Sequence, residues 1–175
     1  MLALPSLQKE YALCFSYDPA FDLPDVPDLT EDASSEEVAL FEKANAAREE
    51  LLRVPRATGD WSSVTKPNAQ PTRFIFRQVH GNLLSWWRGE KARRNLDAIE
   101  GLELMFRIAC TRVENCGDFH IKHDDGRPQL VSIPTLNALY AFGHDIGKAK
   151  LGRSLVLELG AVVLKRAIEG CPPLS

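Results

Sequence analysis

A run of acidic residues interrupted by prolines limits what the first third of the chain can fold into. Between Asp18 and Glu37 there are eight acidic residues and no basic one. Pro19, Pro24 and Pro27 exclude a regular helix from the first half of this run, so we expect it to be extended. Apolar residues are interleaved with the acids at Phe21, Leu23, Val26 and Leu29. The pattern fits a surface linker, an arm docked on the basic part of the same chain, or an arm that grips a partner.

The rest of the chain carries the opposite charge. Residues 1–60 hold 13 acidic and 5 basic residues, a net charge of −8, whereas the remainder holds 11 acidic and 16 basic residues, a net charge of +5. The 175 residues, of which 45% are apolar and 26% charged, suffice for one ordinary globular domain. We therefore expect an acidic arm followed by a mildly basic body.

Signals of secretion, membrane insertion and a bound cofactor are not found in the sequence. No apolar run approaches the roughly 18–20 residues that span a bilayer, and residues 1–5 lack the basic flank of a secretory signal. The cysteines follow no zinc or redox spacing, and we expect free thiols at Cys14, Cys110, Cys116 and Cys171. We expect an intracellular protein with no membrane partner and no cofactor.

Apolar periodicity predicts an α+β fold that is mainly helical, with a short strand and a small β-hairpin. Helices are expected at about 34–53, from Asn82, at 95–114, from Pro134 to Gly143 and at 153–169; the strand is expected at 72–79 and the hairpin at 118–131. The last helix is apolar over much of its circumference, which suits the core or an oligomer interface. This division predicts an extended acidic arm at 1–33, an amphipathic helix and linker at 34–71, and a mainly helical globular body at 72–175.

The first expected helix has clear start and stop signals. Ser34 or Ser35 can cap it, Glu37 can complete a capping box, and Pro55 is expected to end it. Its apolar residues recur every three or four positions, which predicts one buried stripe and an exposed charged face. The stripe comprises Val38, Leu40, Phe41, Ala44, Ala47, Leu51 and Leu52.

A short histidine motif offers one enzymatic hypothesis. The string His144-Asp145-Ile146-Gly147-Lys148 resembles the central motif of the HD superfamily of metal-dependent phosphohydrolases. That resemblance implies a divalent metal that activates water for attack on a phosphate ester. Two of the four ligands of that family are present, but Asp145 is the last aspartate of the chain, so the downstream ligand is missing. The alternative is a polar turn capped by Asp145.

Four possible metal ligands also fall within nine residues, at Cys116, His120, His123 and Asp124. If the residues around 119–122 are extended, alternate side chains face opposite ways and the two histidines diverge. We favour exposed hairpin residues and a free thiol over a zinc site at this position.

Basic and aromatic residues gather between Arg73 and Arg94, a span of 22 residues with a single acid, Glu90. Such a patch could bind phosphates and stack on bases, but the chain has a pI near 5.8 and no recognised nucleic-acid motif. We favour a protein interface, in which one of two adjacent tryptophans is buried and the other reaches a partner. The candidate interaction residues are Phe74, Phe76, Arg77, Trp86, Trp87 and Arg88.

The order of short motifs along residues 71–170 suggests a family. The motifs are Pro71-Thr72-x-Phe74-x-Phe76-Arg77, Ile108-Ala109-x-x-x-Val113-Glu114-Asn115, Lys122-His123-Asp124-Asp125-Gly126 and Glu158-Leu159. This layout resembles that of small tail-assembly-chaperone-like proteins of tailed bacteriophages. The long acidic arm and the glycine-rich turn at 144–152 depart from that pattern and leave open a minor structural protein of the virion.

The resemblance implies a non-enzymatic protein that acts through protein-protein contact in phage morphogenesis. Its partners would be other phage structural or tail proteins, or further copies of itself, with no active site and no metal. It would be found in the cytoplasm of the bacterial host or in the virion. The competing functions are an HD-type phosphohydrolase centred on His144 and Asp145, and a nucleic-acid-binding protein.

Overall fold

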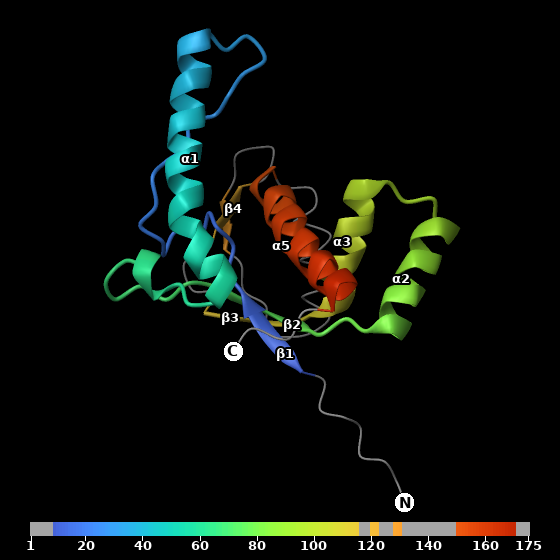
Figure 1. The fold of residues 1–175 in the computed structure, drawn as a ribbon. Helices are drawn as coiled ribbons and strands as arrows, with labels where there is room; N and C mark the ends of the chain where they lie inside the picture. The colour runs from blue at the N-terminus through green and yellow to red at the C-terminus, as the bar shows by residue number, and fades with distance from the viewer. Residues whose placement is uncertain (1–8, 116–119, 123–127, 131–149, 171–175) are drawn as a thin grey trace, which may run out of the picture. The chain divides into compact units, whose positions relative to one another are not determined.

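The computed structural model describes residues 9–115, 120–122, 128–130 and 150–170, and side chains are described for 9–115 and 155–170. Its elements are β1 (Glu10–Leu13), α1 (Ser35–Thr58), the 3-10 helix η1 (Ser62–Val64), β2 (Arg73–Arg77), α2 (Gly81–Arg93), α3 (Ala98–Ala109), β3 (Cys110–Glu114), β4 (His120–Lys122), β5 (Pro128–Leu130) and α5 (Lys150–Glu169) (Figure 1). The expected α+β, mainly helical fold class is confirmed. Among these residues, no helix is both long and apolar enough to cross a membrane.

The chain forms two compact units that differ from the division expected from the sequence. One unit joins residues 1–18 to 72–175, and the other consists of 19–71. The first residues belong to the body because β1 pairs antiparallel with β2, with Tyr11 opposite Phe76 and Leu13 opposite Phe74. Apolar residues alternate in β1 before the acidic run begins, so this segment can complete a sheet. The acidic run and α1 are thus inserted between two neighbouring strands.

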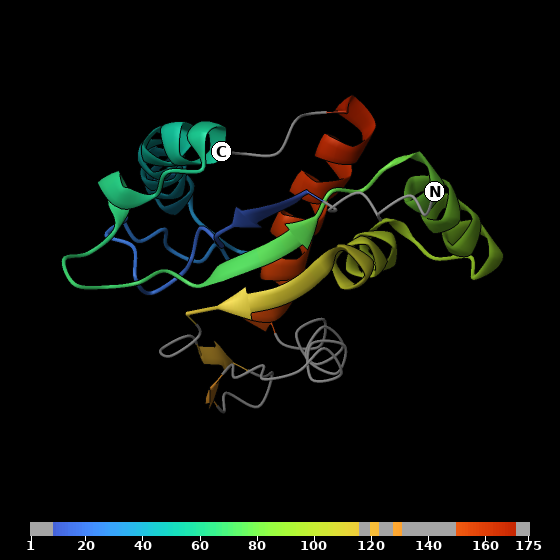
Figure 2. The ribbon, with the colours of Figure 1, turned by 90° about the horizontal axis from the view of Figure 1, so that it is seen from below.

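The core of the first unit lies between one face of its sheet and the helices α3 and α5. The sheet has the order β1-β2-β3 and is antiparallel throughout, and Figure 2 shows α5 crossing one of its faces. Phe74 and Phe76 are fully buried on that face, and the Phe76 ring meets Phe106 of α3 edge-on at 5.5 Å between centroids. From α5 come Leu155, Val156, Leu159 and Val163, all buried. The prediction that the last helix belongs to the core is confirmed.

Two predicted helix boundaries in this unit are wrong. The helix expected at 95–114 ends at Ala109, and the chain continues as β3, because Cys110, Arg112 and Val113 pair with β2 and a β-branched side chain such as that of Val113 suits the pleated surface. The helix expected to start at Asn82 begins at Gly81 after His80, which makes no side-chain capping bond.

The start of α1 is confirmed and its predicted end is wrong. Ser34 caps the helix, and Ser34 and Glu37 form the expected capping box. The helix runs through Pro55 to Thr58, and Gly59 ends it in the left-handed conformation with φ 76°. Pro55 lacks one helical N–H and its ring crowds the carbonyl four residues earlier, but it lies in the last turn, where the helix is about to end, and it is buried.

The acidic run after Asp18 begins by packing within the second unit, whereas Asp18 itself belongs to the first unit and accepts a hydrogen bond from the backbone N–H of Thr72 at 2.8 Å. The first part of the run contains no helix, as expected, but Phe21 is buried, stacks on Trp61 at 4.9 Å between centroids, and bridges to Thr65. Arg48 of α1 donates from Nη1 to the carbonyl oxygen of Pro24 at 2.7 Å. This part of the run is therefore docked on residues of its own unit.

The hairpin expected at 118–131 is confirmed in its paired part. β4 and β5 are antiparallel, and Ile121 lies opposite Gln129. The helix expected at 134–143 and the His144–Gly152 turn up to residue 149 lie outside the described residues, as do Cys116, His123 and Asp124.

Candidate protein-interaction surface

Two of the six candidate interaction residues belong to the core instead. Phe74 and Phe76 have no exposed surface. They cannot reach a partner while α3 and α5 cover the sheet, so their prediction as contact residues is wrong. The reason is that the sheet has only one fully apolar face, and the chain's own helices cover it. Arg77 is half-buried beside them, and its Nε donates to the carbonyl oxygen of Ile108 at 2.8 Å.

The two adjacent tryptophans of α2 have different environments. Trp87 is 7% exposed, and its Nε1 donates to the carbonyl oxygen of Gly101 in α3 at 2.9 Å. The ammonium group of Lys91 lies 5.7 Å from the Trp87 ring centroid. Trp87 therefore holds α2 against α3 and is not a contact residue. Trp86 is 50% exposed, which agrees with the expectation that one tryptophan is buried and its neighbour is free to reach a partner.

Trp86 and Arg88 lie at opposite edges of the exposed face of α2. Successive helical residues are about 100° apart around the axis, so residues two apart are separated by about 160° the short way. Between them lie the exposed small residues Ser85, Gly89 and Ala92. A Cβ built on Gly89 meets nothing within 4 Å. What remains of the predicted surface is a shallow helical face with one tryptophan and one arginine at its rims.

Most of the nearby basic groups have partners within the chain. Arg93 donates from Nη2 to Glu90 at 2.6 Å, and Arg94 lies 4.0 Å from the same carboxylate. The hydrogen bond from Arg93 lowers the pKa of Glu90, which stays ionised and offsets the positive charge at neutral pH. This pairing leaves a weaker positive patch than the sequence suggested for binding phosphates.

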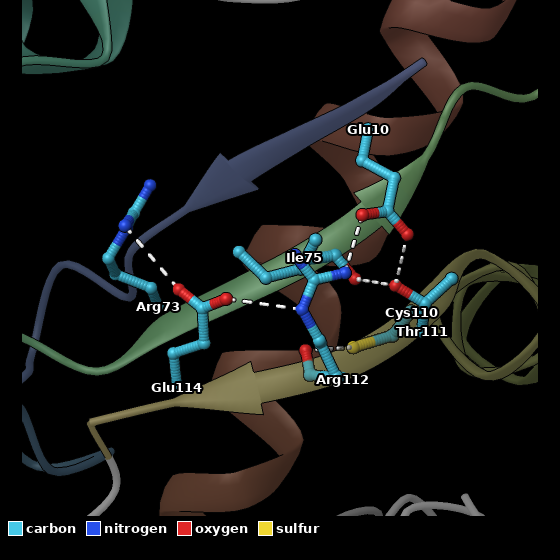
Figure 3. A network of polar contacts seen from close by, with 7 residues as sticks. All are labelled: Glu10, Arg73, Ile75, Cys110, Thr111, Arg112 and Glu114. Carbon is cyan, nitrogen blue, oxygen red and sulfur yellow. Dashed lines mark hydrogen bonds and ion pairs between the residues drawn. The ribbon is translucent and has the colours of Figure 1, made fainter. Parts of the chain in front are cut away.

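A polar network on the outer face of the sheet was not found from the sequence. Arg73 pairs with Glu114, which also accepts from Arg112, and Arg112 pairs with Glu10 (Figure 3). The hydrogen bond from Arg112 lowers the pKa of Glu10. These residues come from three strands that are distant in sequence, and only the strand register places acids beside bases. The result is an exposed face of paired charges, unlike the apolar centre of a protein interface.

An exposed apolar stripe on α1 was also missed. Of the seven residues predicted to form its buried stripe, Leu52 is fully buried, Val38, Phe41 and Ala44 are half-buried, and Leu40, Ala47 and Leu51 are exposed. The sequence of α1 contains two sets of apolar residues, each repeating at intervals of three and four residues on its own side of the helix. Only tertiary contacts show which of the two sides is covered.

The described residues contain no cluster of possible metal ligands, and their two free thiols are buried. Within that part of the chain, no group of three histidine, cysteine or acidic residues could hold a metal ion. Cys14 and Cys110 are buried free thiols, and burial raises the pKa of each to about 12, so neither is a thiolate at neutral pH. His144 and Asp145 lie outside the described residues.

Comparison of the chain with models of protein families, with curated proteins and with solved structures finds no match.

Proposed function

We propose that this protein is non-enzymatic and acts by binding another protein in bacteriophage assembly, as a tail-assembly-chaperone-like factor or as a minor component of the virion. The observation that carries the protein-binding part is Trp86, a half-exposed tryptophan on a helix that Trp87 holds rigidly in place. Tryptophan offers a large contact area and has only two side-chain torsions, so it loses little conformational entropy when a partner covers it, and it is enriched among the residues that contribute most to binding.

The phage part of the proposal is supported by the order of the sequence motifs. Pro71 and Thr72 lead into an extended strand that carries Phe74, helices follow, and Glu158 and Leu159 lie on the late helix α5. This is the layout on which the resemblance to tail-assembly-chaperone-like proteins depends. The partner would be another structural or tail protein of the phage, held soluble or in register while its own site is occupied.

The α2 face suits a helix or strand of such a partner. Ser85, Gly89 and Ala92 let a backbone approach closely, Trp86 supplies apolar area on one side, and Arg88 can pair with a carboxylate on the other. Trp and Arg are the residues most enriched among strong interface contacts.

The binding test compares variants of the α2 face against proteins captured from the native source. Trp86→Ala should weaken binding of the main captured protein by about 30-fold, the effect of losing about 2 kcal/mol at an interface centre. Ser85→Ala, on the same face, should bind as the wild type does. Equal capture by Trp86→Ala and the wild type would show that the face is not the binding site.

The phage assignment is tested by where the protein sits in material from its native source, with density-gradient separation and mass spectrometry of the fractions. Fixed stoichiometry with particles supports a virion component, and a soluble complex with a tail protein supports a chaperone. Association with no phage protein would contradict the assignment. About one transition metal per chain, lost in His144→Ala, would support the phosphohydrolase instead.

A further inference from the structure

Helix α1 presents an apolar seam with the spacing of a coiled coil. We define this α1 seam as Leu40, Ala44, Ala47, Leu51 and Val54, which follow one another at steps of four, three, four and three residues. At 3.6 residues per turn these five positions fall within an arc of about 80°. The three large side chains are well exposed, at 63% for Leu40, 46% for Leu51 and 52% for Val54. Alternation of three and four is the pattern by which one helix packs along another.

The seam is separate from the side of α1 that packs within its own unit. That other side carries Arg48, Leu52 and Pro55, all buried, and its centre lies about 90° around the helix from the seam. Arg48 is held there by its hydrogen bond to the carbonyl oxygen of Pro24. The helix therefore has a covered apolar side and a second apolar strip that its own unit leaves exposed.

We propose that the α1 seam binds the same seam of a second copy of this chain, with the two helices antiparallel about a two-fold axis near Ala47. In that arrangement Leu40 of one copy meets Val54 of the other, and Ala44 meets Leu51. Each large side chain at Leu51 then lies against a small one, and the central alanines let the helix axes come close. A two-fold contact of this kind is self-complementary and closes at a dimer.

The charges beside the seam distinguish the antiparallel dimer from a parallel one. Lys43 and Glu50 are exposed and both occupy the position just before a seam residue. When the helices are antiparallel, such positions face each other, so Lys43 of each copy lies beside Glu50 of the other. In a parallel pair Lys43 would instead face the covered side of the other helix, where Arg48 is buried, and would gain no acidic partner there. Antiparallel helices also bring opposite ends of their dipoles together.

Glu50 is compatible with that added contact. It accepts a hydrogen bond from Arg53 Nη2 at 3.1 Å, and both side chains are largely exposed. An exposed pair of this kind contributes little by itself and leaves the carboxylate able to accept from a second base.

The seam is short, which predicts a reversible dimer. Leu40 to Val54 spans about 21 Å, or about two heptads. We therefore expect sedimentation or light scattering to show a monomer-dimer equilibrium with a dissociation constant in the micromolar range, about 10⁻⁶ to 10⁻⁴ M.

The decisive experiment is a charge exchange measured by sedimentation equilibrium on the full chain. Lys43→Glu alone and Glu50→Lys alone should each weaken the dimer by about tenfold or more, because each places two like-charged pairs across the seam. The double variant Lys43→Glu with Glu50→Lys should restore dimerisation to within about threefold of the wild type, since both pairs form again with reversed sign.

Two further variants separate loss of the dimer from loss of the fold. Leu51→Glu should abolish the dimer, whereas Ala46→Glu adds the same charge to an exposed position about 120° from the seam and should leave it intact. Both should keep the helical circular dichroism of the wild type, because glutamate is a good helix former at exposed positions.

A wild-type chain that stays monomeric at about 0.5 mM would overturn the proposal. So would a dimer that Leu51→Glu leaves unchanged, or a double charge variant no better than either single one. Trp86→Ala should not alter this dimer, so its outcome is distinguishable from that of the proposed function.

Discussion

Gly160 lets α5 approach α3 more closely than any residue with a side chain would allow. A Cβ built on Gly160 lies 2.7 Å from the carbonyl oxygen of Leu102, 3.3 Å from its carbonyl carbon and 3.4 Å from its Cβ. The nearest of these atoms belongs to the backbone of α3, so a rotamer change cannot relieve the clash. The helices would have to move apart, and this would loosen packing around the fully buried Met105 and Leu159.

Gly160→Ala should therefore destabilise the protein although alanine is the better helix former. Overpacking a well-filled core costs about 1–3 kcal/mol, and we expect the upper end because backbone must yield. The higher helix propensity of alanine relative to glycine stabilises the folded state by about 1 kcal/mol. The net loss is about 2 kcal/mol, which for a chain of this size lowers Tm by about 4–8 °C.

Gly89→Ala is the matched control. It makes the same substitution inside α2, where the new Cβ meets nothing within 4 Å. In this variant only the higher helix propensity of alanine has an effect, so the free energy of unfolding should rise by about 0.5–1 kcal/mol. Urea unfolding of the three proteins, followed by far-UV circular dichroism, measures both changes. If Gly160→Ala is as stable as Gly89→Ala, the close α3–α5 contact does not exist and the reasoning is refuted.

Further predictions concern a cap, a buried hydrogen bond, two thiols and an ion pair. Ser34→Ala should lower the free energy of unfolding, measured in urea, by about 1 kcal/mol, because α1 loses its capping box. An unchanged free energy of unfolding would mean that the cap is not formed. Trp87→Phe should lower the free energy of unfolding by about 0.5–1.5 kcal/mol, since the carbonyl oxygen of Gly101 loses the hydrogen bond from the indole but keeps its place in the helical ladder of α3; an unchanged free energy of unfolding would contradict the indole hydrogen bond. Cys14 and Cys110 should resist a thiol reagent at pH 8 until urea unfolds the chain, because burial raises the pKa of each to about 12. Mass spectrometry identifies the modified residues, and fast labelling of these two in the native protein would argue against their burial. Because the pKa of Glu10 is lowered in the folded protein, its carboxylate stabilises the fold above its unfolded pKa, and this stabilisation is lost as the pH falls through its folded pKa. In Glu10→Gln the free energy of unfolding should therefore fall slightly less as the pH is lowered. An unchanged dependence of the free energy of unfolding on pH would indicate that the ion pair is not formed.

Features that depend on contacts within a few residues could be predicted from the sequence. The Ser34 cap and its box with Glu37 involve residues three apart, and β4 pairs with β5 from residues as close in sequence as Lys122 and Pro128. Strand alternation places Phe74 and Phe76 on one face, but their burial under α3 and α5 of the same chain could not be predicted from it. The apolar circumference of α5 indicated a covered helix and left open whether the chain's own core or a partner covers it. Such patterns are set by backbone geometry and hydrophobic periodicity, whatever the rest of the chain does.

The candidate surface could be predicted only in part. That one tryptophan of the pair would be buried and the other exposed follows from the 100° step of a helix, but which one is buried depends on the carbonyl of Gly101 in α3. Likewise, α1 carries two apolar patterns, and only packing against the rest of its unit shows that the Leu52 side is covered while the α1 seam is exposed.

The sequence by itself determined the fold class, the start of α1, the pairing of the hairpin and the apolar character of α5. Only the tertiary structure decided that residues 10–13 complete the sheet, that the chain leaves α3 at Ala109 to form β3, and that Phe21 of the acidic run packs on Trp61. The physical reason is the same in each case. Residues such as Tyr11 or Cys110 can adopt more than one local conformation at little cost, and contacts with residues distant in sequence supply the free energy that selects one.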